Sequence, residues 1–269
     1  MTPIALTIAG SDPSAGAGIQ ADLKTFAALG VYGASVITAL TAQNTQRVFA
    51  IHDVPAEFVG AQLDAIFSDL EVGAIKIGMV SSRAVIAAIA DGIARWRNGG
   101  GVGKVVLDPV LAASSGASLL APDALDALKR LLIPCALLVT PNLDEAARLL
   151  DLPLARDEAA MHEQGERLLA LGAQAVLIKG GHGGGVESVD LLMDKTGSTR
   201  LASARVATRN THGTGCTLAA AITAGLAKGL PLSDAVRSAK SYVTAALTAA
   251  DRIKVGSGHG PLNHFHVWW

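Results

Sequence analysis

Short segments of consecutive apolar residues alternate with helical patterns along this chain, and this alternation restricts the possible folds more than any other feature of the sequence. Consecutive apolar residues are typical of strands buried on both faces of a sheet. Between these segments, apolar residues recur at helical spacing, as Val59, Leu63 and Phe67 do. The sequence therefore predicts an α/β fold with a central, mostly parallel sheet and helices on both faces, with strands at residues 4–9, 34–40, 74–77, 105–107, 137–139 and 175–178.

The pattern changes over residues 186–206, where two strand-like segments flank the turn-forming run 194–197 and predict an antiparallel hairpin. Two long, alanine-rich helices are expected after it, at residues 214–228 and 233–251. No linker rich in proline or serine and no fixed-period repeat divides the sequence. We therefore expect a single domain that spans residues 1–269.

Charge and cysteine content argue against several classes of function. The 22 basic and 23 acidic residues give a formal net charge of −1, so the chain lacks the basic field that gathers nucleic acid or anionic membranes. Its two cysteines are too few for a disulfide framework and fit a reducing compartment, which predicts a cytoplasmic protein. The N-terminal residues lack a signal-peptide pattern, and polar residues interrupt both long uncharged stretches, so no transmembrane helix is expected.

Residues able to bind a ligand follow most of the predicted strands. Ligands of open parallel sheets bind at the carboxyl ends of the strands, so these residues are expected to meet at one edge. They are glycines, amides, carboxylates and one lysine: Gly10, Gln43, Asp108, Asn142, Glu145, Lys179, Gly213 and Gly215. The sequence therefore predicts a ligand site at this edge of the sheet.

The strongest of these segments is the glycine-flanked turn Gly213, Thr214 and Gly215, which directly precedes a predicted helix. Backbone N–H groups at the positive end of a helix dipole bind anions, so the turn is a candidate phosphate site. No Walker sequence is present. Two other interpretations stay open: a tight turn without ligand, and a truncated dinucleotide fingerprint that lacks its third glycine.

Cys216 lies in the first turn of the same predicted helix. The helix dipole favours a thiolate there, which predicts a pKa below the ~8.5 of a free cysteine and a role as base or nucleophile. The alternative is a small residue that only packs well.

Two carboxylates and one lysine complete the candidate chemistry. Asp108 and Glu145 suit a hydrated Mg²⁺ ion that also binds substrate phosphates. Lys179, followed by two glycines, suits charge balance on a phosphoryl group in transit. A turn aspartate, a first-turn helix acid and a surface lysine are the corresponding structural interpretations.

With these residues named, the sequence resembles the hydroxymethylpyrimidine/phosphomethylpyrimidine kinases of thiamine biosynthesis, a branch of the ribokinase superfamily. The resemblance covers nearly the whole chain, and several of its motifs are specific to this branch. The motifs are LTIAGSDPS at 6–14, GAGIQADLKT at 16–25, KIGM at 76–79, VLDPV at 106–110, TPNL at 140–143, KGGH at 179–182, NTHGTGCTL at 210–218 and HFHVWW at 264–269.

The resemblance implies a ribokinase-like, three-layer αβα fold and a homodimer. It also implies two successive ATP-dependent reactions with Mg²⁺. The first phosphorylates the alcohol of 4-amino-5-hydroxymethyl-2-methylpyrimidine, and the second converts the monophosphate to the diphosphate.

By resemblance, Gly213, Thr214 and Gly215 form the anion hole for the migrating phosphoryl group, and Lys179 neutralises the charge that develops on it. Asp108 and Glu145 act through Mg²⁺, while Asn142, Glu145 and the two glycines contact the nucleotide. Relatives across the superfamily usually carry an aspartate base where this chain has Cys216.

The resemblance also implies which residues contact the pyrimidine. Gln43 corresponds to the position that reads the ring, where an amide both donates and accepts a hydrogen bond, although some relatives carry glutamate there. Met79 and Val110 would form apolar walls, Gly10 would allow close approach of the backbone, and Asp22 is a further polar candidate. The structural alternatives are a turn residue for Gln43, a core residue for Met79 and a solvated helix residue for Asp22.

Three other functions remain open at this point. Pyridoxal kinase activity is the nearest, because that substrate is also a small heteroaromatic hydroxymethyl compound. An NAD-dependent oxidoreductase would use the 213–215 turn for a dinucleotide, and a non-catalytic binding protein would hold the pyrimidine without consuming ATP.

Overall fold

The computed structural model of the protein describes residues 1–101, 103–112, 120–121, 123–181 and 185–269. These residues include nine strands that form one sheet in the order β3-β2-β1-β4-β5-β6-β7-β8-β9. The strands are β1 Ile4–Ser11, β2 Tyr32–Gln43, β3 Val48–Asp53, β4 Ala74–Ile77, β5 Val105–Leu107, β6 Leu138–Val139, β7 Ala175–Lys179, β8 Glu187–Asp194 and β9 Gly197–Ala204. The helices are α1 Gly18–Ala28, α2 Ala56–Phe67, α3 Arg83–Asn98, α4 Ala124–Ala127, α5 Leu143–Leu150, α6 Glu158–Ala170, α7 Thr214–Ala227 and α8 Leu232–Thr248.

The sheet is parallel through its centre and antiparallel at both edges. Strands β2, β1, β4, β5, β6 and β7 pair in parallel, whereas β3, β8 and β9 run antiparallel to their neighbours. The predicted α/β class is therefore confirmed, as is the hairpin, whose strands β8 and β9 flank residues 195–196. Strand β3 was not predicted, because most of its side chains are exposed and it has no buried face that would impose an apolar pattern.

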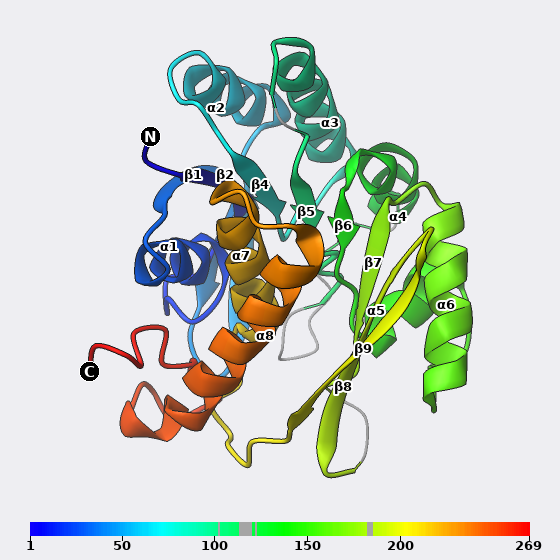
Figure 1. Ribbon diagram of the computed structural model, residues 1–269. Coiled ribbons are helices and arrows are strands. Elements are labelled where there is room, and N and C mark those ends of the chain that lie inside the picture. The colour runs from blue at the N-terminus through cyan, green and yellow to red at the C-terminus, as the bar shows by residue number, and fades with distance from the viewer. Residues whose placement is uncertain (102, 113–119, 122, 182–184) are drawn as a thin grey trace.

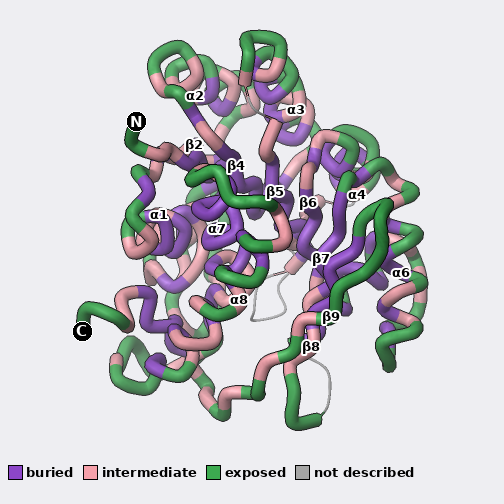
Figure 2. The backbone as a smooth tube through the Cα atoms, viewed as in Figure 1, coloured by how far each residue is buried: buried purple, intermediate pink, exposed green. Residues whose placement is uncertain are grey.

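Helices cover both faces of the sheet and complete three layers (Figure 1). Alternate strand residues point to opposite faces, so Val105 and Leu107 join one core cluster while Val106 joins another. The first cluster packs under α2, α3, α4, α5 and α6. The other face packs against α1, α7 and α8. The central strands are accordingly buried while the outer helix surfaces are exposed (Figure 2).

A local sequence signal determines where helix α5 begins. Asn142 accepts a hydrogen bond from the Glu145 N–H, and the Glu145 carboxylate accepts one from the Asn142 N–H, a capping box that starts α5. The predicted helix at 214–228 is observed as α7, whereas the apolar pattern around Leu128 forms one short α turn, then a wider π turn and a 3₁₀ turn. Within the described residues, none of the helices is both long and apolar enough to span a membrane.

Candidate active site

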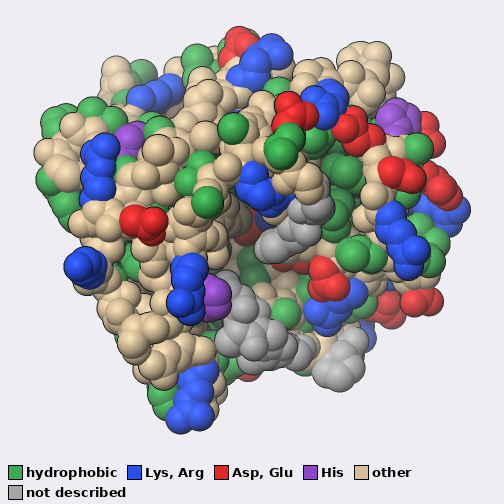
Figure 3. Space-filling view, turned by 90° about the horizontal axis from the view of Figure 1, so that it is seen from below, with side chains coloured by type: hydrophobic (Ala, Val, Ile, Leu, Met, Phe, Trp, Pro, Cys, Tyr) green, Lys and Arg blue, Asp and Glu red, His purple; other side chains and the backbone are tan. Residues whose placement is uncertain are grey.

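A cavity of about 730 Å³ lies at the carboxyl ends of the parallel strands. Seen from this side, the surface is hollowed near its centre and charged side chains of both signs lie around the hollow (Figure 3). Of the residues singled out in the sequence, the cavity wall includes Gly10, Gln43, Met79, Asp108, Val110, Asn142, Glu145, Lys179, Gly213, Thr214, Gly215 and Cys216. Strand ends that are far apart in the chain meet here because parallel strands all finish at the same edge.

The turn that starts α7 faces this cavity. Gly213 has a φ of 80°, and a Cβ at this position would lie 1.9 Å from the backbone oxygen of Gly16. Only glycine fits such a conformation so close to another backbone segment. The Thr214 hydroxyl donates to the Thr211 carbonyl, so the turn is held by its own hydrogen bonds. The first N–H groups of α7 are the kind that bind anions at a helix N-terminus.

Lys179 lies between two carboxylates. Its ammonium donates to Asp108 Oδ1 over 2.8 Å and lies 3.7 Å from Glu145 Oε2. Asp108 follows β5, Glu145 lies in the first turn of α5, and Lys179 ends β7, so adjacent parts of the sheet edge bring the three together. A Cβ on Gly215 would lie 3.2 Å from Lys179 Nζ, which places the ammonium beside the glycine-flanked turn.

Burial changes the titration of this cluster. It raises the pKa of Glu145 to about 7, because desolvation outweighs the attraction of Lys179. Burial alone would favour the neutral amine of Lys179, but the charges of Asp108 and Glu145 outweigh it and hold the Lys179 pKa above its ordinary value. Lys179 is therefore a permanent cation in the cavity.

The pKa of Cys216 corrects the expectation from the helix dipole. Desolvation raises the pKa of the thiol to about 11, even though the Lys76 charge opposes the shift. The helix N-terminus is therefore insufficient to make a thiolate in the unliganded protein, because the low-dielectric surroundings penalise the charged form more strongly. The thiol still lines the cavity beside the turn.

Asp22 does not line the cavity, contrary to the expectation for a substrate contact. The side chains of Asp22 and Lys76 are both fully buried, and their ion pair is 2.8 Å long. The Thr7 hydroxyl donates to the same carboxylate oxygen. Asp22 is therefore neither a substrate contact nor a solvated helix residue; it balances a buried ammonium beneath the cavity floor, where Lys76 reaches the wall.

The cavity also has an apolar wall and an amide. Met79, Val110 and Ala39 pack together. A Cβ on Gly10 would lie 2.9 Å from Met79 Sδ, so glycine is what allows Met79 to pack against the β1 backbone. Gln43, the last residue of β2, lines the cavity near this wall. One apolar surface and one bidentate amide suit a small polar heteroaromatic ring.

Comparison with known proteins assigns the chain to a family. The sequence pattern of phosphomethylpyrimidine kinase matches residues 12–263. The chain belongs to this family. It is 60% identical over 269 residues, 100% of this chain and 99% of the relative, to a hydroxymethylpyrimidine/phosphomethylpyrimidine kinase of Rhizobium meliloti.

Two solved structures share the fold. The phosphomethylpyrimidine kinase of Clostridium difficile is 43% identical, with a TM-score of 0.80 over 91% of this chain and 99% of that one. The pyridoxal kinase of Staphylococcus aureus in complex with ADP is 34% identical, with a TM-score of 0.90 over 100% of this chain and 95% of that one. Sequence identity therefore ranks the pyrimidine kinase first while overall shape ranks the pyridoxal kinase first. Side chains rather than backbone shape select a substrate, so sequence identity is a better guide to the substrate than the TM-score.

Several residues of the cavity wall were not predicted from the sequence, and Asp12 and His212 are two of them. His212 Nε2 lies 2.8 Å from Asp12 Oδ2, and this contact joins the loop after β1 to the start of the α7 turn. Asp12 follows the first strand and His212 precedes the Gly213 turn, so their positions in the sequence were the signal that could have identified them as cavity residues. Their pairing across 200 residues of sequence has no local signature.

Proposed function

We propose that this enzyme transfers the terminal phosphoryl group of ATP to 4-amino-5-hydroxymethyl-2-methylpyrimidine and then to the resulting monophosphate, in the synthesis of thiamine diphosphate. The observation that carries the proposal is one cavity that combines the turn at the start of α7, the Lys179 cluster and the Gln43 amide. The activity for which the relatives from Rhizobium meliloti and Clostridium difficile are named supports the same proposal.

In this proposal the turn of Gly213, Thr214 and Gly215 holds the phosphoryl group while it moves from ATP to the acceptor. Its N–H groups are fixed before the reaction, so they stabilise negative charge without reorganisation. Lys179 adds a full positive charge beside the turn. Met79, Val110 and Gln43, which line the same cavity, would hold the ring.

Asp108 and Glu145 suit a magnesium ion. No group of three or more His, Cys, Asp or Glu side chains could hold a metal in the part of the chain that the structure describes. Mg²⁺ is commonly bound by one or two carboxylates together with phosphate oxygens and water, which matches two carboxylates that line a phosphate cavity. Glu145 fits this role because its desolvated carboxylate gains stability from a nearby cation. The ion would neutralise charge on the nucleotide phosphates, with Asn142 positioning Glu145 through the capping box.

Cys216 would take the proton of the alcohol in the first reaction. The second acceptor is already a phosphate oxyanion and has no proton to lose, and loose phosphoryl-transfer transition states ask little of a base. Only the thiolate form of Cys216 can accept this proton, and a pKa of about 11 keeps the thiolate scarce near neutral pH. The scarcity would limit the first reaction alone, because the second needs no base.

The direct test incubates the protein with the pyrimidine, ATP and Mg²⁺ and follows the products by mass spectrometry. We expect the mass of one added phosphate and then of a second, with two ADP formed per diphosphate. Omitting Mg²⁺ should abolish both products. If no phosphate is added to the pyrimidine, the proposal is wrong.

Pyridoxal is the second candidate substrate, favoured by the high TM-score to the pyridoxal kinase of S. aureus. Its phosphorylation should be measured beside that of the pyrimidine under the same conditions. A higher kcat/KM for pyridoxal would reverse the order of the two candidates.

We also propose that the enzyme is cytoplasmic and forms a homodimer. The exposed side chains of Phe49 and Ile51, which share one face of the edge strand β3, offer apolar surface for self-association. Light scattering coupled to size exclusion would report the mass of a dimer, and a monomer at micromolar concentration would contradict the proposal.

A further inference from the structure

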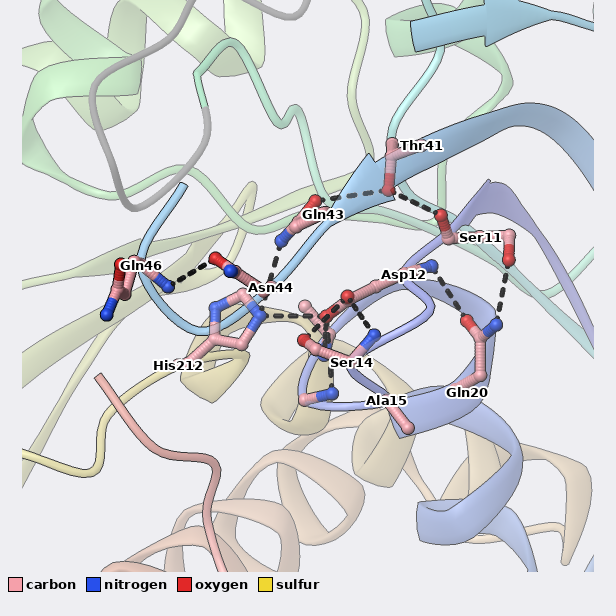
Figure 4. Close-up of polar contacts among 12 residues, drawn as sticks. Ser11, Asp12, Ser14, Ala15, Gln20, Thr41, Gln43, Asn44, Gln46 and His212 are labelled. Carbon is pink, nitrogen blue, oxygen red and sulfur yellow. Dashed lines mark hydrogen bonds and ion pairs between the residues drawn. The ribbon is translucent and has the colours of Figure 1, made fainter. Parts of the chain in front are cut away.

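Gln43 lies between two groups whose hydrogens are already committed elsewhere. Its Oε1 is 3.3 Å from Thr41 Oγ1, and its Nε2 is 3.4 Å from His212 Nε2 (Figure 4). A primary amide can turn over by 180° and exchange the positions of oxygen and nitrogen while filling the same space. The protons of its neighbours therefore determine which orientation is stable.

The Thr41 hydroxyl has one proton, and the Ser11 carbonyl takes it. Thr41 Oγ1 lies 2.9 Å from Ser11 O, and a carbonyl oxygen only accepts hydrogen bonds. The hydroxyl oxygen is left as an acceptor toward Gln43. It therefore favours the amide nitrogen, not the amide oxygen, on its side.

His212 presents a hydrogen to Gln43 from the other side. Its Nε2 lies 2.8 Å from Asp12 Oδ2. The Asp12 carboxylate also accepts from the Ser14 N–H and hydroxyl and from the Gly16 and Ala17 N–H groups, so it acts as an acceptor throughout. Burial opposes ionisation of Asp12, but the hydrogen bonds from His212 and Ser14 outweigh it and hold its pKa below the ordinary value.

His212 Nε2 must therefore carry a proton, and it does so whether the ring is neutral or charged. Two donors face each other when the Gln43 nitrogen points to His212, and two acceptors face each other on the Thr41 side. Turning the amide over removes both conflicts at once. Its oxygen then faces the Nε2–H of His212 and shares the proton that His212 donates to Asp12, while its nitrogen donates to Thr41.

We propose that His212 and Thr41 lock the Gln43 amide with its oxygen toward His212, and that this lock makes the enzyme select a 4-aminopyrimidine over the corresponding 4-oxopyrimidine. His212 is a positioning residue in this scheme, because it acts on the substrate through Gln43. Asp12 in turn holds the His212 proton in place. The selectivity part of the inference rests on the function proposed above.

The lock matters because the two pyrimidines present reversed hydrogen-bonding edges. A 4-aminopyrimidine donates from its amino group and accepts at the adjacent ring nitrogen, whereas a 4-oxopyrimidine accepts at oxygen and donates from the ring N–H. A freely turning amide complements both edges, as it can exchange its donor and acceptor. A fixed amide complements only one of them, since the hydroxymethyl group must face the 213–215 turn and the ring cannot reverse.

The orientation itself can be tested without substrate, by NMR of the ligand-free protein with nitrogen-15 labelling. We expect nuclear Overhauser contacts from the Gln43 amide protons to the Thr41 side chain, and a His212 ring protonated at Nε2. Amide-proton contacts to the His212 ring, or an unprotonated Nε2, would overturn the lock. This measurement is decisive even if the enzyme acts on neither pyrimidine, so its failure is distinguishable from failure of the proposed function.

The consequence can be tested by the ratio of kcat/KM for the 4-amino and 4-oxo pyrimidines. A bidentate amide–base pair discriminates by roughly ten- to hundredfold, which is the ratio expected here. His212→Leu and Thr41→Val should each lower it about tenfold, whereas His212→Gln, which restores an N–H donor, should retain most of it. Losses of folding or of phosphoryl transfer affect both substrates equally and cancel in the ratio.

Gln46→Ala is the matched control, because Gln46 lies in the loop that follows β2 but is exposed and donates to Ser257 instead. Its ratio should equal that of the unmodified enzyme. Unchanged ratios in both His212→Leu and Thr41→Val would refute the lock as a source of selectivity. A native enzyme that uses both pyrimidines equally well would refute it too.

Discussion

Replacing Gly213 by alanine should disable phosphoryl transfer while leaving most of the fold intact. The new Cβ would lie 1.9 Å from the Gly16 oxygen, a distance that no real Cβ tolerates, and both contacting groups belong to backbone. The turn and the loop at residues 16–17 must separate by about 1 Å to restore an ordinary contact. Misplacement of a reacting group by about 1 Å costs about 100-fold in rate, so kcat/KM should fall by about this factor in both reactions.

Gly229 provides a matched control at the other end of α7. Its φ of 88° is also left-handed, yet an added Cβ would meet nothing within 4 Å. Gly229→Ala should therefore carry only the conformational cost of about 1–2 kcal/mol in the free energy of unfolding, with kcat/KM unchanged. The pair of variants separates left-handed strain from collision at the phosphoryl-binding turn.

The assay measures ADP release for each reaction together with urea unfolding of each variant. We expect Gly213→Ala to unfold at a urea concentration similar to that of Gly229→Ala but to lose about 100-fold in kcat/KM. This combination would support the role of the turn in phosphoryl transfer. Activity of a folded Gly213→Ala variant within threefold of the unmodified enzyme would refute the reasoning, because the collision would then leave the reacting groups in place.

Three further predictions concern the buried charges and the base. Cys216→Ala should impair phosphorylation of the alcohol by about 100-fold, the lower end for loss of a general base, and that of the monophosphate much less. Equal losses in separate assays would contradict a role as base. Asp22→Asn leaves the buried Lys76 ammonium unpaired and should destabilise the fold by about 3–5 kcal/mol in urea unfolding, while Asp22→Leu combined with Lys76→Met recovers most of the loss. Because burial raises the pKa of Glu145 from 4.5 to about 7, the proton that the native state retains stabilises it most below pH 4.5, and this contribution is lost as the pH rises through 7. The free energy of unfolding of the ligand-free enzyme should thus fall between pH 5 and 8 relative to that of Glu145→Gln, and parallel pH profiles would refute the assignment.

The sequence was sufficient for the α/β class with a mostly parallel sheet and for many of the polar residues that line the cavity. Buried parallel strands appear as consecutive apolar residues, and their carboxyl ends mark where a ligand binds, so Asp108, Lys179 and the 213–215 turn were found before their contacts were known. The edge strand β3 could not be predicted from the sequence, because it is exposed and has no buried face that would impose an apolar pattern.

Only the tertiary structure decided how the polar residues share the interior. Asp22 and Cys216 have ordinary local contexts, but packing buries the first against Lys76 and desolvates the second until its pKa rises to about 11. The contact of Asp12 with His212 likewise joins loops 200 residues apart. Periodicity in a sequence records which face of an element avoids water. Desolvation and charge pairing depend on the other elements packed around a group, and these are set by the assembled sheet.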